Sequence, residues 1–314
     1  MEEINKLKVE LENWANETAE FYHQKAQDPK FDFAFHTQSN LNKVTQSPAL
    51  LILAINPGVD GKYTEQIINE EWKKWGINGR MDGETLLKGN PWWKNRNEWG
   101  FWQRLNNIFN RGGIKDILQN ESRFVLSNLT FFTTKKETSL PNVFEECTEK
   151  TIKLINILRP KHILCLGRAN CIDHLKRIGK FEVKELLPFN CLSYGKFNGI
   201  PVYGINHPAS RPTIEEMELI GKCLNFLMNN SQKEFSLEEM QEQFSDEIKA
   251  VKARKSCVKM PDKTKINAQE IVDYFRENPL SNVSDDKGKT IRFFIDGIDK
   301  DKLEITVTTA EGVV

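Results

Sequence analysis

Four short and almost entirely apolar runs, each ending in polar or turn-forming residues, constrain the fold of this chain more than any other feature. The clearest run is 49–55 (ALLILAI), which ends at Asn56-Pro57-Gly58. Three similar runs follow at 123–129, 162–167 and 200–205. Runs of this length without polar alternation are typical of strands that are buried on both faces of a sheet.

Between these runs, apolar residues recur at the spacing of an α-helix. This spacing predicts helices over about 4–21, 100–111, 142–158, 168–178 and 213–229. Strands that alternate with helices favour an α/β fold, because each crossover places a helix on a face of a parallel sheet. We therefore expect a three-layer α/β/α architecture with a central, mostly parallel sheet.

The residues at the ends of the four runs indicate where a functional site is expected. In open parallel sheets, ligands bind outside the carboxyl ends of the strands. Here the runs end in Asn56, Asn128, Gly167 and Asn206-His207. We expect these residues to meet at one edge of the sheet.

Composition excludes several classes of protein. The 44 basic and 44 acidic residues balance, so binding to nucleic acid would depend on local basic clusters. The six cysteines form no C-x-x-C pair, which argues against a zinc knuckle or an iron–sulfur cluster and fits reduced cytosolic thiols. No apolar run approaches the roughly 20 residues of a membrane span, and the first residues lack the apolar stretch of a signal peptide. We expect a cytoplasmic protein without metal, cofactor or membrane contact.

The character of the sequence changes after about residue 232. We expect a main domain over 1–232, a helical linker over 233–262 and a small appended α+β module over 263–314. Within the module, a short helix is predicted near 268–277 and two strands over 290–295 and 303–309. Residues 59–100 read as a long irregular insertion rich in Trp, Asn, Lys and Gly, a kind of loop that is often functional.

Three of the strand ends carry motifs. Residues 54–58 (AINPG) resemble the G-[IM]-N-P-G motif of the mismatch-specific and single-strand-selective uracil-DNA glycosylases, and residues 206–211 (NHPASR) resemble the H-P-S-P-R motif of the second of these branches. Residues 125–129 (VLSNL) resemble the middle strand of that fold, which ends in a base-reading Asn. Over about 45–228 the order of the motifs agrees. The chain thus resembles the uracil-DNA glycosylase superfamily, which implies a uracil-DNA glycosylase-like fold and an enzyme that flips a base out of DNA.

The resemblance implies a role for each of three residues. A glycosylase extrudes the base into a pocket, positions water on one side of the sugar and stabilises negative charge on the departing base. Asn56 would position the water, His207 would donate to O2 of the base, and Asn128 would read its Watson–Crick edge. From the residues alone, Asn56 and Asn128 fit a turn or strand end almost equally well. An amide orients water without deprotonating it, so we expect modest turnover.

The sequence departs from the family pattern at the base pocket. Gly58 stands where the strict uracil enzymes carry a bulky Tyr, and the missing side chain would leave room for a C5 substituent. The G-x-x-F segment that supplies the stacking aromatic ring is not recognisable. We expect Tyr63, Trp92 and Trp93 as the stacking candidates. Phe101 and Trp102 stand at helical spacing with Leu105 and Phe109, and these four are predicted to form core.

Contacts with DNA are expected from the loops around the site. Ala209 replaces the usual Ser of the H-P-S-P-R motif, and Ser210 is expected to compensate. Arg211 would enter the duplex or clamp a phosphate, although a solvated side chain is an almost equal alternative. Lys62, Trp92 and Trp93 would extend the surface. Further basic residues are Lys73, Lys74, Lys88, Lys94, Arg96, Lys135 and Lys136.

Three functional hypotheses follow. The first is a monomeric, monofunctional DNA glycosylase that releases a uracil-like or modified pyrimidine and leaves an abasic site, in base excision repair or in defence against modified phage DNA. No lysine occupies a motif position suited to a Schiff base. The second is a protein of the same fold that binds DNA or a nucleotide without cleavage, which the altered stacking segment and Ala209 favour. The third, a generic nucleotide-binding enzyme, lacks both G-x-x-x-x-G-K-[ST] and G-x-G-x-x-G.

Overall fold

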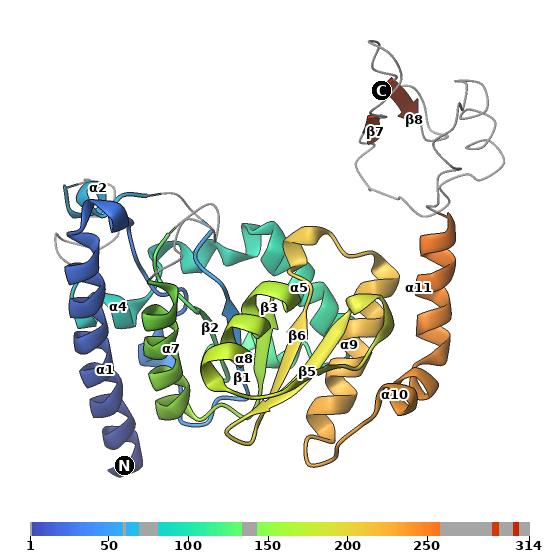
Figure 1. Cartoon of the computed structure of the whole chain (residues 1–314), viewed down its shortest axis with the longest axis horizontal. Helices are drawn as coiled ribbons and strands as arrows, with labels where there is room; N and C mark the ends of the chain where they lie inside the picture. Colours follow the sequence, from blue (N-terminus) through green and yellow to red (C-terminus); the bar gives the residue numbers. More distant parts are fainter. Residues whose placement is uncertain are drawn as a thin grey trace. The chain divides into compact units, whose positions relative to one another are not determined.

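A mixed six-stranded sheet with the order β2-β1-β3-β6-β5-β4 forms the centre of the main unit (Figure 1). The computed structural model describes residues 2–58, 61–68, 81–133, 143–257, 291–294 and 304–307. The strands are β1 (Leu50–Ala54), β2 (Phe124–Asn128), β3 (Ile163–Leu166), β4 (Val183–Glu185), β5 (Leu192–Phe197) and β6 (Ile200–Ile205). Strands β2, β1, β3 and β6 are parallel, whereas β5 and β4 continue the sheet in antiparallel pairing.

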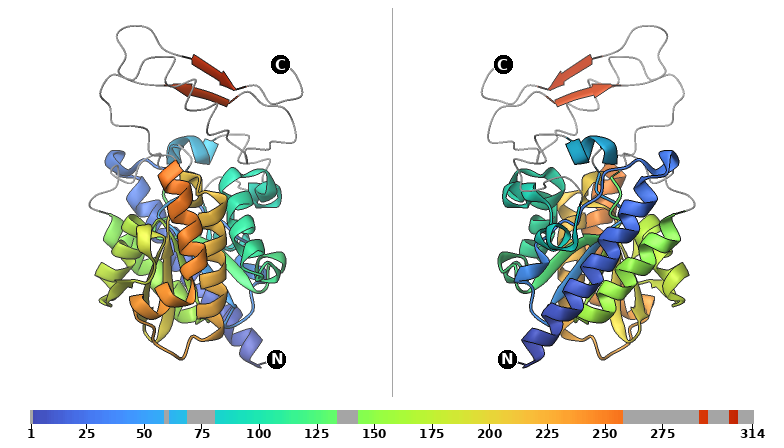
Figure 2. Two further views of the ribbon diagram at one scale, coloured as in Figure 1. Left: turned by 90° about the vertical axis from the view of Figure 1, so that its right-hand side faces the viewer. Right: turned by 90° about the vertical axis from the view of Figure 1, so that its left-hand side faces the viewer.

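Helices cover both faces of the sheet, as the sequence predicts. Leu51 and Leu53 of β1 belong to a core with α1 (Glu2–Ala26), α7 (Phe144–Leu158) and α8 (Asp173–Gly179). Leu50 and Ile52 belong to a second core with α5 (Gly100–Arg111) and α9 (Ile214–Asn229). Figure 2 shows α7 and α8 in green on one side of the sheet and α5 in teal on the other. Because neighbouring strand residues face opposite ways, these continuous apolar runs supply both cores. The α/β/α architecture is therefore confirmed.

The four predicted strands and the predicted helices of the main unit are present within a few residues of their expected bounds. Two differences stand out. The β4–β5 hairpin was not predicted, since β4 has only three residues and β5 mixes polar with apolar residues. The helix expected over 168–178 begins as a π-helical turn, η5 (Arg168–Ile172), before α8 continues.

An extended segment, residues 34–39, runs antiparallel along the free edge of β2 and its continuation. The amides of His36 and Ser39 donate to the carbonyls of Phe131 (3.2 Å) and Leu126 (3.1 Å). The 59–100 insertion is partly helical, with α2 (Tyr63–Ile68), α4 (Gly83–Lys88) and η3 (Pro91–Glu98). Shorter turns are η1 (Pro29–Phe31), η2 (Leu41–Lys43), α6 (Asp116–Gln119), η6 (Pro188–Asn190) and η7 (Pro208–Ser210).

The boundary of the main unit differs from the expected one. The chain divides into two units, Met1–Arg254 and Lys255–Val314. Helices α10 (Leu237–Gln243) and α11 (Ser245–Cys257) confirm the helical character expected over 233–262. Residues 233–254 nevertheless belong to the first unit, so the expectation that they form a linker is wrong. The linker was expected because most residues of this segment are charged or polar. At helical spacing, however, the segment also carries apolar residues that lie in the core: Met240, Phe244, Ile248 and Val251.

The second unit contains the two predicted strands. Strand β7 (Ile291–Phe294) pairs antiparallel with β8 (Glu304–Val307). The helix expected near 268–277 lies outside the described residues. Among the helices that are described, none has both the length and the apolar character needed to cross a bilayer.

The crossing of α5 and α9 depends on two glycines. A Cβ atom at Gly221 would overlap the carbonyl oxygen of Ile108, and one at Gly112 would overlap the carbonyl of Gly221. We expect Gly221→Ala to lower the free energy of unfolding by about 3 kcal/mol, because the obstacle is rigid helix backbone. Urea denaturation measures this. The control is Gly100→Ala in α5, where the nearest atoms belong to the flexible Arg104 side chain at 3.5 Å or more. Equal stability of the two variants would contradict the prediction.

Buried histidines make the stability of the main unit depend on pH. Burial lowers the pKa of His36 and of His162 from 6.5 to about 4. Between these values the unfolded chain takes up protons that the folded chain does not, so stability falls as the pH drops from 6.5 towards 4. For the fully buried His36 the loss is about 3 kcal/mol. Urea denaturation across this range should show the slope, and His36→Gln should reduce it; an unchanged slope would contradict the assignment.

Candidate functional site

A cavity of about 520 Å³ lies at the carboxyl ends of the four parallel strands. Its lining includes Asn56, Asn128, Gly167 and His207, from the ends of β1, β2, β3 and β6 in turn. Successive strands β2 and β3 lie on opposite sides of β1, which is the arrangement that opens a crevice in doubly wound sheets. The expectation that these strand ends meet around one cavity is therefore confirmed. The volume is typical of small-molecule sites.

The turn that carries Asn56 is fastened to the end of β2. Beyond the last strand pair, the amides of Leu129 and Thr130 donate to the carbonyls of Ala54 (2.8 Å) and Ile55 (2.9 Å). The Asn56 amide group itself donates to the Pro57 carbonyl (3.2 Å), a contact that orients the side chain. Gly58 follows at the cavity wall, with open space where a Cβ atom would stand.

Asn128 is the most deeply buried polar residue of the cavity. Its backbone carbonyl accepts from the Thr151 hydroxyl of α7 (2.9 Å), so the end of β2 is held in place. The side chain is 1% exposed, and its Nδ2 atom has no hydrogen-bond partner in the described part of the chain. An unpaired buried donor costs about 1–3 kcal/mol. Asn128 lines the cavity, and a ligand oxygen bound beside its amide group would satisfy this donor.

His207 is held in one tautomer by its own loop. Nδ1 accepts the amide of Ala209 (3.1 Å), so in the neutral ring the proton resides on Nε2. Burial lowers the pKa of His207 below its usual 6.5, and the ring is therefore neutral at pH 7. The Ser210 hydroxyl donates to the His207 carbonyl (2.7 Å) and stabilises the turn. Among the described residues Nε2–H has no acceptor, so the site offers a second directed donor.

Two aromatic rings form a wall that the sequence did not reveal. Phe101 lines the cavity and lies 5.8 Å from the His207 ring, and Trp99 stacks on Phe101 at 5.9 Å and 24°. Phe101 was predicted to be core, as Trp102, Leu105 and Phe109 are. Trp102, Leu105 and Phe109 are buried, as their helical spacing predicts. Phe101 lies in the first turn of α5, beside the cavity.

The predicted stacking residue Tyr63 is not at the cavity. It is 2% exposed, stacks on Phe35 at 5.5 Å and forms a short hydrogen bond to His23 Nδ1. The residue begins α2 and its ring belongs to the core. The expectation that Tyr63 stacks on a base is therefore wrong.

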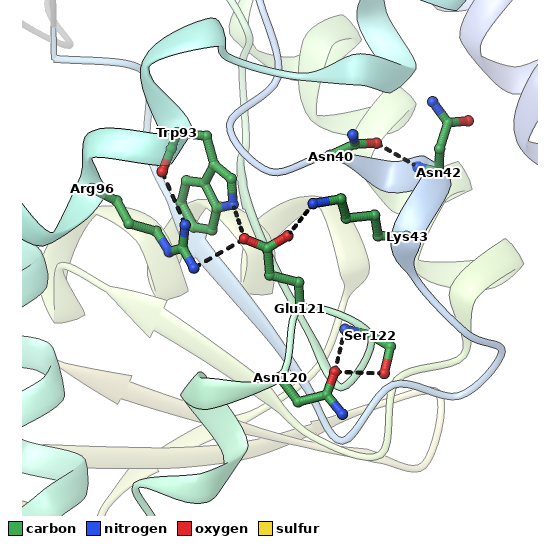
Figure 3. A network of polar contacts seen from close by, with 8 residues as sticks. All are labelled: Asn40, Asn42, Lys43, Trp93, Arg96, Asn120, Glu121 and Ser122. Carbon is green, nitrogen blue, oxygen red and sulfur yellow. Dashed lines mark hydrogen bonds and ion pairs between the residues drawn. The ribbon is translucent and has the colours of Figure 1, made fainter.

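Trp93 and Arg96 are also withdrawn from the predicted DNA surface (Figure 3). Trp93 is 6% exposed, and its indole nitrogen donates to Glu121 (3.2 Å). Arg96 pairs with the same carboxylate at 2.9 Å and lies over the Trp93 ring at 4.7 Å, while Lys43 reaches its second oxygen at 2.7 Å. This network anchors η3 to the core and buries Trp93, so the expectation that Trp93 contacts DNA is wrong. Arg96 remains partly exposed with its guanidinium paired to Glu121, and its contact with DNA stays a prediction.

The remaining predicted DNA contacts are at the surface. Lys62 and Arg211 are exposed and Trp92 is half-buried, so their contacts stay predictions. The Ser210 hydroxyl proton is engaged by the His207 carbonyl, which leaves none for a phosphate in this conformation. Lys88 pairs with Glu84 (2.8 Å). The basic residues Lys73, Lys74, Lys135 and Lys136 lie outside the described residues.

Sequence reasoning missed three amides of the cavity: Gln38, Asn90 and Asn170. None of them belongs to a strand-end motif, and only the fold of the edge segment, η3 and η5 brings them to the site. The described lining residues include neither a carboxylate nor a Lys or Arg. A cavity of amides, one neutral imidazole and aromatic rings suits an uncharged, planar, hydrogen-bonding group.

Comparisons of the sequence with known protein families and with curated proteins found no match.

Proposed function

We propose that this protein is a monofunctional DNA glycosylase that draws a pyrimidine base into the cavity and hydrolyses its N-glycosidic bond. One observation carries the proposal. Asn56, Asn128 and His207, which are far apart in the chain and match three motifs of the uracil-DNA glycosylase superfamily, line a single cavity at the carboxyl ends of the strands.

The donors of the cavity suit a base with two carbonyl oxygens. Nδ2 of Asn128 would donate to O4, and Nε2–H of His207 would donate to O2, where negative charge accumulates as the bond to the sugar breaks. Phe101 would stack on the ring in place of the family's usual aromatic residue. The base leaves with the electron pair of the glycosidic bond, water supplies the hydroxyl of the sugar, and the remaining proton of the water ends on the departed base.

Asn56 would orient that water. Because no carboxylate is among the described lining residues, the site has an amide where a stronger catalyst would have a base. Catalysis would then depend mainly on stabilisation of the leaving base, and turnover would be modest.

Release of free base from DNA tests the proposal. Single- and double-stranded oligonucleotides with uracil, thymine or a C5-modified uracil are incubated with the full chain, and abasic sites are cleaved with alkali. We expect release from at least one substrate and its loss in Asn56→Ala. The matched control is Asn206→Ala, since Asn206 is exposed and does not line the cavity. Release that Asn56→Ala leaves intact would refute the assigned site.

A second function, binding of a base or nucleotide without cleavage, is favoured by the absence of a carboxylate among the described lining residues. It predicts a measurable affinity for uracil-containing DNA that Asn128→Leu abolishes, together with no base release from any substrate. The two functions differ only in the chemical step, so the same assay separates them.

A further inference from the structure

The cavity contains a third directed donor, the amide of Gln38. Asn90 is the N-cap of η3, and its Oδ1 accepts the amide of Trp92 (2.9 Å). The Asn90 Nδ2 group therefore faces the Gln38 Oε1 atom, to which it donates at 3.2 Å. Gln38 lines the cavity, its oxygen is engaged by Asn90, and its Nε2 group forms no hydrogen bond within the described residues. In this series of hydrogen bonds, the Trp92 amide orients the Asn90 side chain, which in turn orients the Gln38 side chain.

The fold places Gln38 beside Asn128. The 34–39 segment pairs with β2 and its continuation, and Gln38 precedes Ser39, whose amide bonds the carbonyl of Leu126. Across the sheet edge, the polar groups thus run in the order Gln38, Asn128, Asn56 and His207. Gln38 lies beyond Asn128 on the side away from His207.

The positions of His207, Asn128 and Gln38 along this row match the order of O2, O4 and C5 around a pyrimidine. If His207 meets O2 and Asn128 meets O4, the next position along the ring is C5. From this we infer that Gln38, oriented by Asn90, is a specificity-determining residue that donates a hydrogen bond to an acceptor oxygen on a C5 substituent. Gly58 also lines the cavity, with open space where a Cβ atom would stand. The inference rests on the proposed function, because it uses the orientation of the base given there.

Binding of free bases to the full chain, measured by calorimetry, tests the inference without the chemical step. Uracil, thymine and 5-formyluracil are compared, since the formyl oxygen accepts a hydrogen bond and the methyl group of thymine does not. We expect 5-formyluracil to bind roughly threefold to tenfold more tightly than thymine, as one net hydrogen bond provides. In Gln38→Met, which keeps the length of the side chain, the ratio of the two affinities should fall to about one.

A second variant tests the orienting role of Asn90. In Asn90→Asp, the carboxylate still caps η3 but offers only acceptors to Gln38, whose amide would rotate to donate to it. Gln38 would then present Oε1 to the cavity, so 5-formyluracil should lose its advantage over thymine. 5-Hydroxymethyluracil, whose hydroxyl group both accepts and donates, should bind more tightly than thymine to wild type and should keep that advantage in Asn90→Asp. A merely structural role of Asn90 would weaken both bases alike. Asn107→Asp, on the exposed part of α5, is the charge-matched control.

The outcomes separate the two proposals. If wild type binds uracil but prefers 5-formyluracil no more than thymine, or if Gln38→Met leaves the preference intact, the role of Gln38 is refuted and the proposed function stands. If wild type neither binds nor releases any of these bases, the proposed function fails and the inference fails with it.

Discussion

Replacing His207 with alanine should lower the rate of base release by about 10²–10³-fold, with a much smaller effect on the affinity for DNA. Removal of one preorganised donor to a developing anion costs about that much in enzymes that stabilise negative charge. His207 fits this role because its Nδ1 accepts the Ala209 amide, which leaves the proton on Nε2. Single-turnover kinetics with a uracil-containing oligonucleotide measures the effect.

A pH profile provides an independent check of the same residue. The pKa of His207 is lowered by burial, so the ring is neutral from the usual value of 6.5 upwards. When the pH falls below this lowered pKa, Nδ1 of His207 takes up a proton and can no longer accept the Ala209 amide. The turn that orients the ring would then be disrupted. Release should therefore be constant near neutral pH and decline on the acid side. Ser210→Ala, which removes only the bond to the His207 carbonyl, should have a smaller effect than His207→Ala. Equal rates in wild type and His207→Ala would exclude His207 from the chemical step.

Replacing Asn128 with leucine should change function and stability in opposite directions. Asn128 Nδ2 is buried and has no hydrogen-bond partner among the described residues, and leucine of similar shape removes that unpaired donor. We expect the free energy of unfolding to rise by about 1–2 kcal/mol. Base release should fall by about 10²-fold or more, since O4 of the base would be buried against a methyl group. Urea denaturation and the single-turnover assay measure the two effects.

The neighbouring Ser127 supplies a matched control for Asn128. Its hydroxyl is likewise buried without a partner in the part of the chain that is described, but Ser127 does not line the cavity. Ser127→Ala should increase stability and leave base release as it is. If Asn128→Leu instead lowered the free energy of unfolding together with the rate of base release, damage to the fold would explain the lost activity. That result would contradict the assigned role of Asn128.

The sequence alone determined the architecture and the backbone of the site. Strands such as 49–55 are apolar at every position, a pattern that requires helices on both faces whatever the distant contacts are. Asn56, Asn128 and His207 each stand at the end of a predicted strand. Parallel pairing brings the carboxyl ends of such strands together. These predictions succeeded because the periodicity of a strand or helix is a local property, which neighbouring residues express.

Tertiary structure alone decided which aromatic rings and amides complete the cavity. Tyr63, Trp93 and Phe101 are equally suited to stacking by chemistry, yet Tyr63 and Trp93 are buried against Phe35 and Glu121, while Phe101 faces His207. Gln38 and Asn90 meet only because the 34–39 segment pairs with β2 and η3 is anchored by the Glu121 network. The burial of a side chain and the direction of its donor depend on contacts between segments far apart in the chain, which local periodicity does not encode.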